Sequence, residues 1–432
     1  MVKFFGILFT GILTSFFFFP FEFTFLPGVN VKMMLAVVGL ALVGYELIRR
    51  RSFSIPLELL ILMAFAFSVS LASLVSITLN QTPDNTYASY IISFVVWLSA
   101  AFAVCCCIRA VHGRIDVQLV LDYLVAVCVF QCVISLVINN SPSLASWVNS
   151  TFEFGQIVAV DADRLYGIGA QLDVAGARFS AVLVGLAFYL SEVTGALNPG
   201  RRILYILAFG VISVIGDMVA RTAIVGMAIG LVFILLGMVF RPSMPGRESD
   251  KTKQVATWIV MLTIGVFFCT VLYNTNAQAK SLFRFGFEGF FSLAENGHWE
   301  VSSNERLKTM VVFPETLHTW IIGDGYFENS RNDPNYLGTA TDMGFYMGTD
   351  VGYLRFIFYF GIIGLIFMMG VIISSAVVCM RNFPKEKWLF ILALMVGLTV
   401  WFKVSTDIFC FFAPFLCAAA LKEQEPTEED YA

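Results

Sequence analysis

Residues 88–108 read ASYIISFVVWLSAAFAVCCCI, a largely apolar run that contains no charged side chain. A helix needs about 20 such residues to cross the hydrocarbon core of a bilayer, because each residue advances it by about 1.5 Å. Such runs recur along the whole chain: 58% of its 432 residues are hydrophobic, 13% are charged, and the mean hydropathy is +0.80. A soluble protein could not bury so much apolar surface, so the sequence predicts an all-α polytopic membrane protein.

The apolar runs predict about twelve transmembrane helices in a single transmembrane domain that covers residues 1–432. Their expected bounds are 3–20, 31–48, 56–79, 88–108, 117–138, 178–197, 202–217, 221–240, 255–273, 351–380, 387–402 and 405–421. The first run carries one lysine, and no small-residue cleavage motif follows it, so we expect a retained span and not a signal peptide. An even number of spans places both termini on one side.

The basic residues indicate which side that is. Most of the 27 lysines and arginines fall in short loops on the side of the termini, for example in Arg49–Arg51 and Arg201–Arg202. Cytoplasmic loops carry such an excess, so the termini are predicted to be inside. Two long loops, 139–176 and 274–350, then lie on the outer, periplasmic face.

The loop 274–350, between the ninth and tenth spans, is the longest polar stretch of the chain and is expected to contain short helices. Ser302 and Glu305 match a capping box at the start of a helical pattern. A bend is expected near Pro314 and a turn at Gly323–Gly325. Loops of this length are usually functional or disordered, and the aromatic residues here argue against disorder.

A set of arginines falls on the outer side, where the orientation rule does not require them. They are Arg164, Arg178, Arg221, Arg284, Arg306 and Arg331. The planar guanidinium binds phosphate and carboxylate groups through paired hydrogen bonds. Arg178 and Arg221 each open an apolar span, so we predict that they clamp a pyrophosphate at the membrane, helped by Arg164 or Arg306. For either residue alone, snorkelling to the interface is the structural alternative.

Three outer residues are candidates for the general base of a transfer reaction. Asp350 stands directly before the tenth span, where its structural alternative is to cap that helix. Glu305 and His318 lie within the large loop. For His318 the structural alternative is the stronger of the two interpretations.

No metal and no cofactor are predicted. The one Asp-x-Asp pattern, Asp161-Ala162-Asp163, is followed directly by Arg164, which could instead pair with either acid. The nine cysteines all fall in or beside apolar segments and are interpreted as small buried hydrophobic residues. No long basic run or repeated aromatic-basic platform is present, which excludes nucleic acid as a partner.

Ionisable residues also fall within the predicted spans, where charge usually marks function. They are Asp122, Glu192, Asp217, Lys403 and Asp407. Most lie near span ends, and Lys403 and Asp407 have the spacing of a helical ion pair. These residues form no chain of acids across the membrane, which argues against a proton-driven transporter.

The order of the outer motifs resembles the bacterial O-antigen polymerase and ligase superfamily, which comprises the Wzy-type polymerases and the lipopolysaccharide O-antigen ligases. The resemblance covers roughly residues 160–370. It rests on Arg164 and Gly167 followed by Arg178, on Asp217–Ala223, on Arg306 followed by Trp320–Gly325, and on Asp350–Leu354 followed by Phe360–Gly364. The second segment keeps the arginine of the family's Ser-x-Ser-Arg opening but lacks its serines.

This resemblance implies a GT-C-like fold with its active site on the periplasmic side of the bacterial inner membrane. The implied reaction is metal-independent polymerisation of oligosaccharide repeats carried on polyprenyl pyrophosphate. Arg178 and Arg221, with Arg164 or Arg306, would neutralise the leaving pyrophosphate, and Asp350, Glu305 or His318 would accept the proton. The implied partners are the lipid-linked oligosaccharide, membrane lipid, a chain-length regulator and a flippase.

Two other functions remain open from the sequence. A ligase would share the fold and the donor but transfer the glycan to lipid A-core. Ligases of the superfamily place a histidine near the position of Asp350, so the aspartate favours a polymerase. A flippase or other transporter should show an internal repeat and a polar central cavity, and the sequence shows neither clearly.

Overall fold

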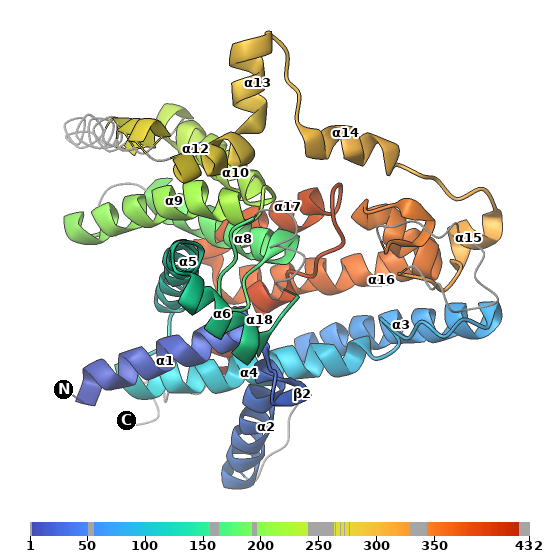
Figure 1. Cartoon of the computed structure of the whole chain (residues 1–432). Coiled ribbons are helices and arrows are strands. Elements are labelled where there is room, and N and C mark those ends of the chain that lie inside the picture. The colour runs from blue at the N-terminus through green and yellow to red at the C-terminus, as the bar shows by residue number, and fades with distance from the viewer. Residues whose placement is uncertain are drawn as a thin grey trace. The chain divides into compact units, whose positions relative to one another are not determined.

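The computed structural model describes residues 2–50, 56–155, 164–191, 197–240, 263, 265–267, 269–271, 273–275, 277–328 and 344–422. Within these ranges the chain is mainly helical (Figure 1). Each predicted span except the ninth, 255–273, coincides with a helix, and most of that ninth span lies outside the described residues. These helices are α1 (Val2–Phe18), α2 (Val31–Arg50), α3 (Leu57–Asn80), α4 (Tyr90–His112), α5 (Val117–Asn140), α8 (Leu172–Ser191), α9 (Pro199–Val219), α10 (Ala223–Phe240), α16 (Gly352–Asn382), α17 (Lys387–Val400) and α18 (Phe409–Lys422).

Seven of the helices in the described part of the chain are long and apolar enough to cross a membrane: α2, α3, α4, α5, α8, α9 and α16. Large apolar side chains also remain exposed on them, including Val37 (68%) on α2 and Phe67 (57%) on α3. Exposed apolar surface on this scale fits lipid and not water. The structure therefore supports a helical membrane protein, while the number of crossings, twelve, stays a prediction.

The remaining elements are short. They are β1 (Glu22–Phe23), β2 (Leu26–Asn30), α6 (Pro142–Thr151), β3 (Phe152–Glu153), α12 (Ala277–Gly286), α13 (Glu288–Asn296), α14 (Ser302–Thr309), α15 (Leu317–Ile321), η1 (Tyr346–Gly348) and η2 (Pro384–Glu386). The strands form a small sheet in the order β2-β1-β3, in which β1 and β3 run antiparallel. The short helices expected in the large loop are present. Residues 329–343 of that loop lie outside the described residues.

The chain folds into two compact units. The first unit consists of residues 1–18, 28–120 and 303–432, and the second of residues 19–27 and 121–302. In the first unit, α2 packs on α4, and α3 packs along α16 (Figure 1). In the second unit, α8 packs on both α9 and α10. A methyl group added at Gly226 of α10 would overlap the backbone of Ser180 on α8, so the close approach of these two helices requires glycine there.

The sequence predicted one continuous helix for the tenth span, 351–380. The structure differs, because α16 is broken at Phe360 and Gly361. Phe360 (φ −134°) and Gly361 (φ 68°, ψ −175°) leave the helical region. The conformation of Gly361 is essentially restricted to glycine. The break exposes backbone carbonyls inside an apolar span, and such groups must find new partners.

The partners come from the Gly323–Gly325 turn, which the sequence predicted. The N–H of Asp324 donates to the carbonyl of Phe358 at 2.6 Å, and the N–H of Gly325 donates to that of Tyr359 at 3.1 Å. The positive φ angles of Gly323 (85°) and Gly325 (75°) shape this turn. Two motifs that the sequence analysis treated separately therefore dock on each other.

Two of the five ionisable residues named for the predicted spans, Asp122 and Asp407, have well-defined polar partners. Asp122 binds Arg201 at 2.7 Å and accepts a hydrogen bond from the Tyr205 hydroxyl. Asp407 accepts hydrogen bonds from the Tyr90 hydroxyl at 2.8 Å and from the backbone N–H of Phe409 at 2.7 Å. Glu192 lies outside the described residues.

The nine cysteines are free thiols, and six of them are buried, as the interpretation of small buried hydrophobic residues requires. The other three, Cys106, Cys107 and Cys269, are partly exposed.

Candidate functional site

Arg221 occupies a sharp corner of the second unit, between α9 and α10. The extended residue Ala220 (φ −154°, ψ 117°) follows the last residue of α9. The backbone remains hydrogen bonded through the corner, because the N–H of Ala220 donates to Gly216 and the N–H of Ala223 donates to Ala220. The opening of the predicted eighth span is thus a rigid turn that presents the arginine.

All three guanidinium nitrogens of Arg221 have protein partners. Nε donates to the carbonyl of Phe285 at 3.1 Å, Nη1 donates to Oγ of Ser302 at 3.3 Å, and Nη2 lies 2.8 Å from Oε2 of Glu288. The Ser302 hydroxyl itself donates to Glu288 at 2.9 Å. The guanidinium also lies 4.1 Å above the centre of the Phe285 ring.

Two further predicted arginines belong to this second unit. The guanidinium of Arg164 lies 5.3 Å from the same Phe285 ring, so the structure brings Arg164 and Arg221 to one aromatic side chain. Arg178 is on α8, with its guanidinium 5.7 Å from the centre of the Phe19 ring. Arg178 and Arg221 are only 6% and 8% exposed. Snorkelling does not explain arginines that the protein itself covers.

Carboxylates accompany these arginines. The Thr222 hydroxyl, next to Arg221 in the chain, donates to Asp173 at the start of α8. Asp217, 1% exposed, lies in the last turn of α9, where an added methyl group at Gly286 would come within 3.1 Å of its Oδ2. Glu288 pairs directly with Arg221, and its side chain is 33% exposed.

This arrangement can hold an anion. A carboxylate oxygen at 2.8 Å from Nη2 of Arg221 occupies the place that a phosphate oxygen would take, since both groups accept the same charge-assisted hydrogen bonds. A pyrophosphate would therefore compete with Glu288 for the same guanidinium. Sequence reasoning missed Glu288 because its role depends on a long-range contact between α13 and the α9–α10 corner.

The first unit contains a second polar cluster, built on the broken helix. Asp324 accepts hydrogen bonds from the hydroxyls of Thr319 at 2.7 Å and Tyr346 at 3.1 Å. Burial raises the pKa of the Asp324 carboxyl, while these two hydrogen bonds act in the opposite direction. Asp84 closes the cluster from the α3–α4 loop by accepting a 2.7 Å hydrogen bond from the N–H of Phe327.

Asp350 is a partner of Arg355. Its Oδ1 lies 3.6 Å from Nη1 of the arginine, which is 7% exposed. Arg355 also donates to the Phe327 carbonyl at 3.1 Å, and its guanidinium lies 3.8 Å from the centre of that ring. The alternative role of Asp350 as helix cap is wrong, because Val351 takes that position. The position of Arg355, one turn inside a predicted span, was the available signal for this buried arginine.

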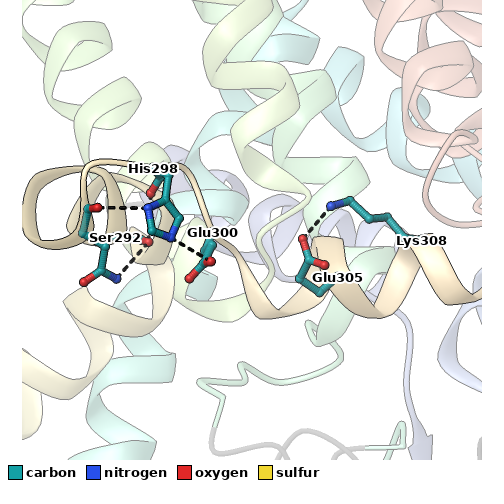
Figure 2. A network of polar contacts seen from close by, with 6 residues as sticks. Ser292, His298, Glu300, Glu305 and Lys308 are labelled. Atoms are coloured by element: carbon teal, nitrogen blue, oxygen red, sulfur yellow. Dashed lines mark hydrogen bonds and ion pairs between the residues drawn. The ribbon is translucent and has the colours of Figure 1, made fainter.

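Glu305 and Arg306 both lie on α14, and both belong to the first unit, separate from the unit of the other three arginines. Figure 2 shows Glu305 beside Lys308, at 2.7 Å, and His298 beside Glu300, at 2.9 Å. In place of the predicted capping box, the Glu305 carboxylate binds Lys308 on the same helix. Both contacts are largely exposed to solvent.

His318 lies on α15, and its Nε2 is 3.0 Å from Oδ1 of Asn80 at the end of α3. One helical turn further, Ile321 and Ile322 line an apolar groove of about 200 Å³ together with side chains of α3 and α16. The histidine therefore stands where a polar loop meets an apolar surface. The sequence offered no means of pairing it with Asn80.

Among the described residues, no cluster of three or more histidine, cysteine or acidic side chains suits a metal ion. The acids of the Asp161-Ala162-Asp163 pattern lie outside the described residues. Comparison of the chain with protein-family models, with curated proteins and with solved structures found no match.

Proposed function

We propose that the chain is a glycosyltransferase of the bacterial inner membrane, which polymerises oligosaccharide repeats linked to polyprenyl pyrophosphate on the periplasmic face. The observation that carries this proposal is the buried Arg221, whose guanidinium binds a carboxylate. A buried guanidinium that already binds one anionic group, in a chain with several membrane-length helices, supports a phosphate group that is attached to a lipid as the substrate.

The proposed reaction joins two lipid-linked units. A hydroxyl of the acceptor glycan attacks the anomeric carbon of the donor, and the bond from that carbon to the pyrophosphate oxygen breaks. The pyrophosphate leaves with the electron pair, so the protein must mainly stabilise negative charge and position the hydroxyl. Arg221, with Arg178 and Arg164 of the same unit, would supply the positive charge without a metal ion or cofactor. The three bases that the sequence predicted, Asp350, Glu305 and His318, belong to the first unit and stay a prediction.

Membrane vesicles that contain the protein and a lipid-linked repeat unit test the proposal. Arg221→Ala should slow chain growth by about 10- to 150-fold, since each charge-assisted hydrogen bond contributes roughly 1.5–3 kcal/mol. Arg284→Ala is the matched control, because Arg284 belongs to the same unit but forms an exposed ion pair with Glu295. The control should polymerise at the normal rate.

The Arg221→Ala variant leaves Glu288 without its cation, so loss of activity could reflect loss of folding. The double variant Arg221→Ala, Glu288→Ala removes both charges and should fold while extending chains as slowly as Arg221→Ala. Normal chain length in the folded double variant would refute the clamp. Transfer to lipid A-core instead of chain growth would indicate a ligase, and repeats retained on the cytoplasmic face would indicate a flippase.

A further inference from the structure

Trp299 lies against the first turn of α13 and stays half-exposed. A methyl group added at Gly289 would overlap two carbon atoms of its indole, Cε2 and Cζ2. Because Gly289 has no side chain, the indole can lie directly against the backbone of the helix. Part of the ring remains accessible, since Trp299 is 47% exposed. The structure thus holds a flat aromatic surface in place and leaves part of it open.

The segment that follows α13 fixes the position of this indole. Gly297, with φ 78°, turns the chain at the end of the helix, and its N–H donates back to the helix at 3.2 Å. The hydroxyl of Ser292 on α13 donates to the carbonyl of His298 at 3.0 Å. His298 and Glu300 contact each other at 2.9 Å (Figure 2), whereas Trp299 between them reaches the backbone of α13. Neighbouring side chains of the segment therefore point to different sides, and that of Trp299 points to the helix.

The indole lies beside the guanidinium site of the second unit. Glu288, which pairs with Arg221 at 2.8 Å, directly precedes Gly289 in the chain. Ser302, which accepts a hydrogen bond from Arg221, follows Trp299 by three residues. The aromatic surface and the arginine therefore meet at the same turn of α13. All of these residues belong to the second unit.

We propose that Trp299 and Phe290 form a subsite for the sugar that is bonded directly to the pyrophosphate of the lipid-linked donor. The inference rests on the proposed function, in which the pyrophosphate binds at Arg221. The anomeric carbon of this sugar is bonded to a pyrophosphate oxygen, so the sugar must lie next to the bound anion. Phe285 is also close to Arg221, but the guanidinium covers the face of its ring at 4.1 Å.

The two rings of the subsite suit the apolar face of a sugar. The centres of the Trp299 and Phe290 rings are 5.0 Å apart and their planes meet at 77°, so they offer apolar surface in two directions. Phe290 is 52% exposed. The face of an aromatic ring carries partial negative charge, which attracts the polarised C–H groups of a sugar ring.

The indole N–H distinguishes a sugar from a lipid chain as the occupant. Within the described part of the chain, Nε1 of Trp299 forms no hydrogen bond. A sugar hydroxyl or ring oxygen accepts a hydrogen bond from such a donor, whereas an isoprenoid chain has no acceptor. An occupant that combines an apolar face with hydroxyl groups therefore satisfies both parts of the tryptophan side chain.

The test measures the binding of three diphosphates to the purified full-length protein in lipid nanodiscs by isothermal titration. They are inorganic pyrophosphate, farnesyl diphosphate, and the oligosaccharide diphosphate released from the cell's own lipid-linked repeat unit. Trp299→Ala should weaken binding of the oligosaccharide diphosphate by about tenfold, because an aromatic contact and one hydrogen bond are together worth roughly that factor. Binding of the other two should not change, since neither carries a sugar.

Two variants separate sugar binding from a general effect on folding. Trp299→Tyr keeps an aromatic ring with a hydrogen-bond donor and should retain most of the affinity for the oligosaccharide diphosphate. Trp147→Ala is the matched control, because Trp147 belongs to the same unit, is 51% exposed and packs edge-on against Phe152 at 5.3 Å. It should leave all three affinities unchanged.

Three results would overturn the subsite. Trp299→Ala could bind the oligosaccharide diphosphate as tightly as the wild type, or it could lose affinity equally for all three diphosphates, which would indicate a structural role. A loss confined to farnesyl diphosphate would show that the indole contacts the lipid chain instead. The proposed function fails separately if Arg221→Ala binds inorganic pyrophosphate as tightly as the wild type does, whatever the result for Trp299.

Discussion

Replacing Gly361 by alanine should disrupt the first unit, because the break in α16 depends on a residue without a side chain. The angles of Gly361 (φ 68°, ψ −175°) cost any other residue about 1–3 kcal/mol. A methyl group there would also overlap the carbonyl of Ile321 and lie 2.6 Å from the nitrogen of Ile322. Relieving that overlap moves α15 away from α16.

That movement would loosen the hydrogen bonds from Asp324 and Gly325 to the carbonyls at the break, which are worth about 0.5–1.5 kcal/mol each. Together with the backbone strain, the expected loss of stability is about 2–6 kcal/mol. Gly44→Ala is the matched control, since no atom lies within 4 Å of a methyl group added at that position on α2 of the same unit.

Thermal unfolding in detergent, followed by the loss of the monodisperse peak, measures both variants. Gly361→Ala should melt several degrees below the wild type. Gly44→Ala should melt at the same temperature or slightly above, because alanine favours a helix. Equal melting temperatures for Gly361→Ala and the wild type would show that the break in α16 is not a feature of the folded protein.

Three further predictions concern charged residues. Burial raises the pKa of Asp324 in the folded protein, so the stability that comes from protonating this carboxyl is complete at low pH and is lost as pH rises through the folded pKa. The difference in melting temperature between Asp324→Asn and the wild type should therefore be more favourable to the variant at pH 8 than at pH 4. The same difference at both pH values would contradict this prediction. Arg355→Met should lower the free energy of unfolding by about 2–4 kcal/mol, which is somewhat less than for a fully buried ion pair because Asp350 is partly exposed. A denaturation midpoint equal to that of the wild type would contradict this prediction. Glu288→Gln weakens the internal competitor for Arg221, so inorganic pyrophosphate should inhibit chain growth at a roughly fivefold lower concentration, and an inhibition constant that stays the same would argue against competition.

The helices could be predicted from the sequence because an apolar run of membrane length is a local signal. Each described helix of the predicted spans begins and ends within several residues of its predicted bounds, as for α3 (Leu57–Asn80, predicted 56–79). The turn at Gly323–Gly325 was equally local, since two glycines next to an aspartate favour positive φ angles. The outer arginines were identified from the side of the membrane on which the predicted spans place them. That assignment also needs no knowledge of contacts between distant residues.

Contacts between distant segments could not be predicted. The single span expected over 351–380 gave no sign that Gly361 would break it, because a glycine inside an apolar run is compatible with a continuous helix. Glu288 and Asn80 looked like ordinary polar residues, and their roles arise from partners 67 and 238 residues away along the chain. A single sequence does not show which loop meets which span.

The polar side chains Ser73 and Asn80 of α3, which bond to residues far along the chain, have a consequence for how the protein is made. Ser73 and Asn80 bond to Tyr359 and Gly323, which follow them by 286 and 243 residues. At about 5–20 residues per second, the ribosome synthesises those partners roughly 10–60 s after α3. During that interval residues 121–302 of the second unit are synthesised, and the serine and asparagine side chains of α3 must be accommodated by water or by the insertion machinery. The first unit can therefore finish folding only after its C-terminal part has been synthesised. The length of the intervening segment 121–302 sets the delay between synthesis of α3 and synthesis of its partners.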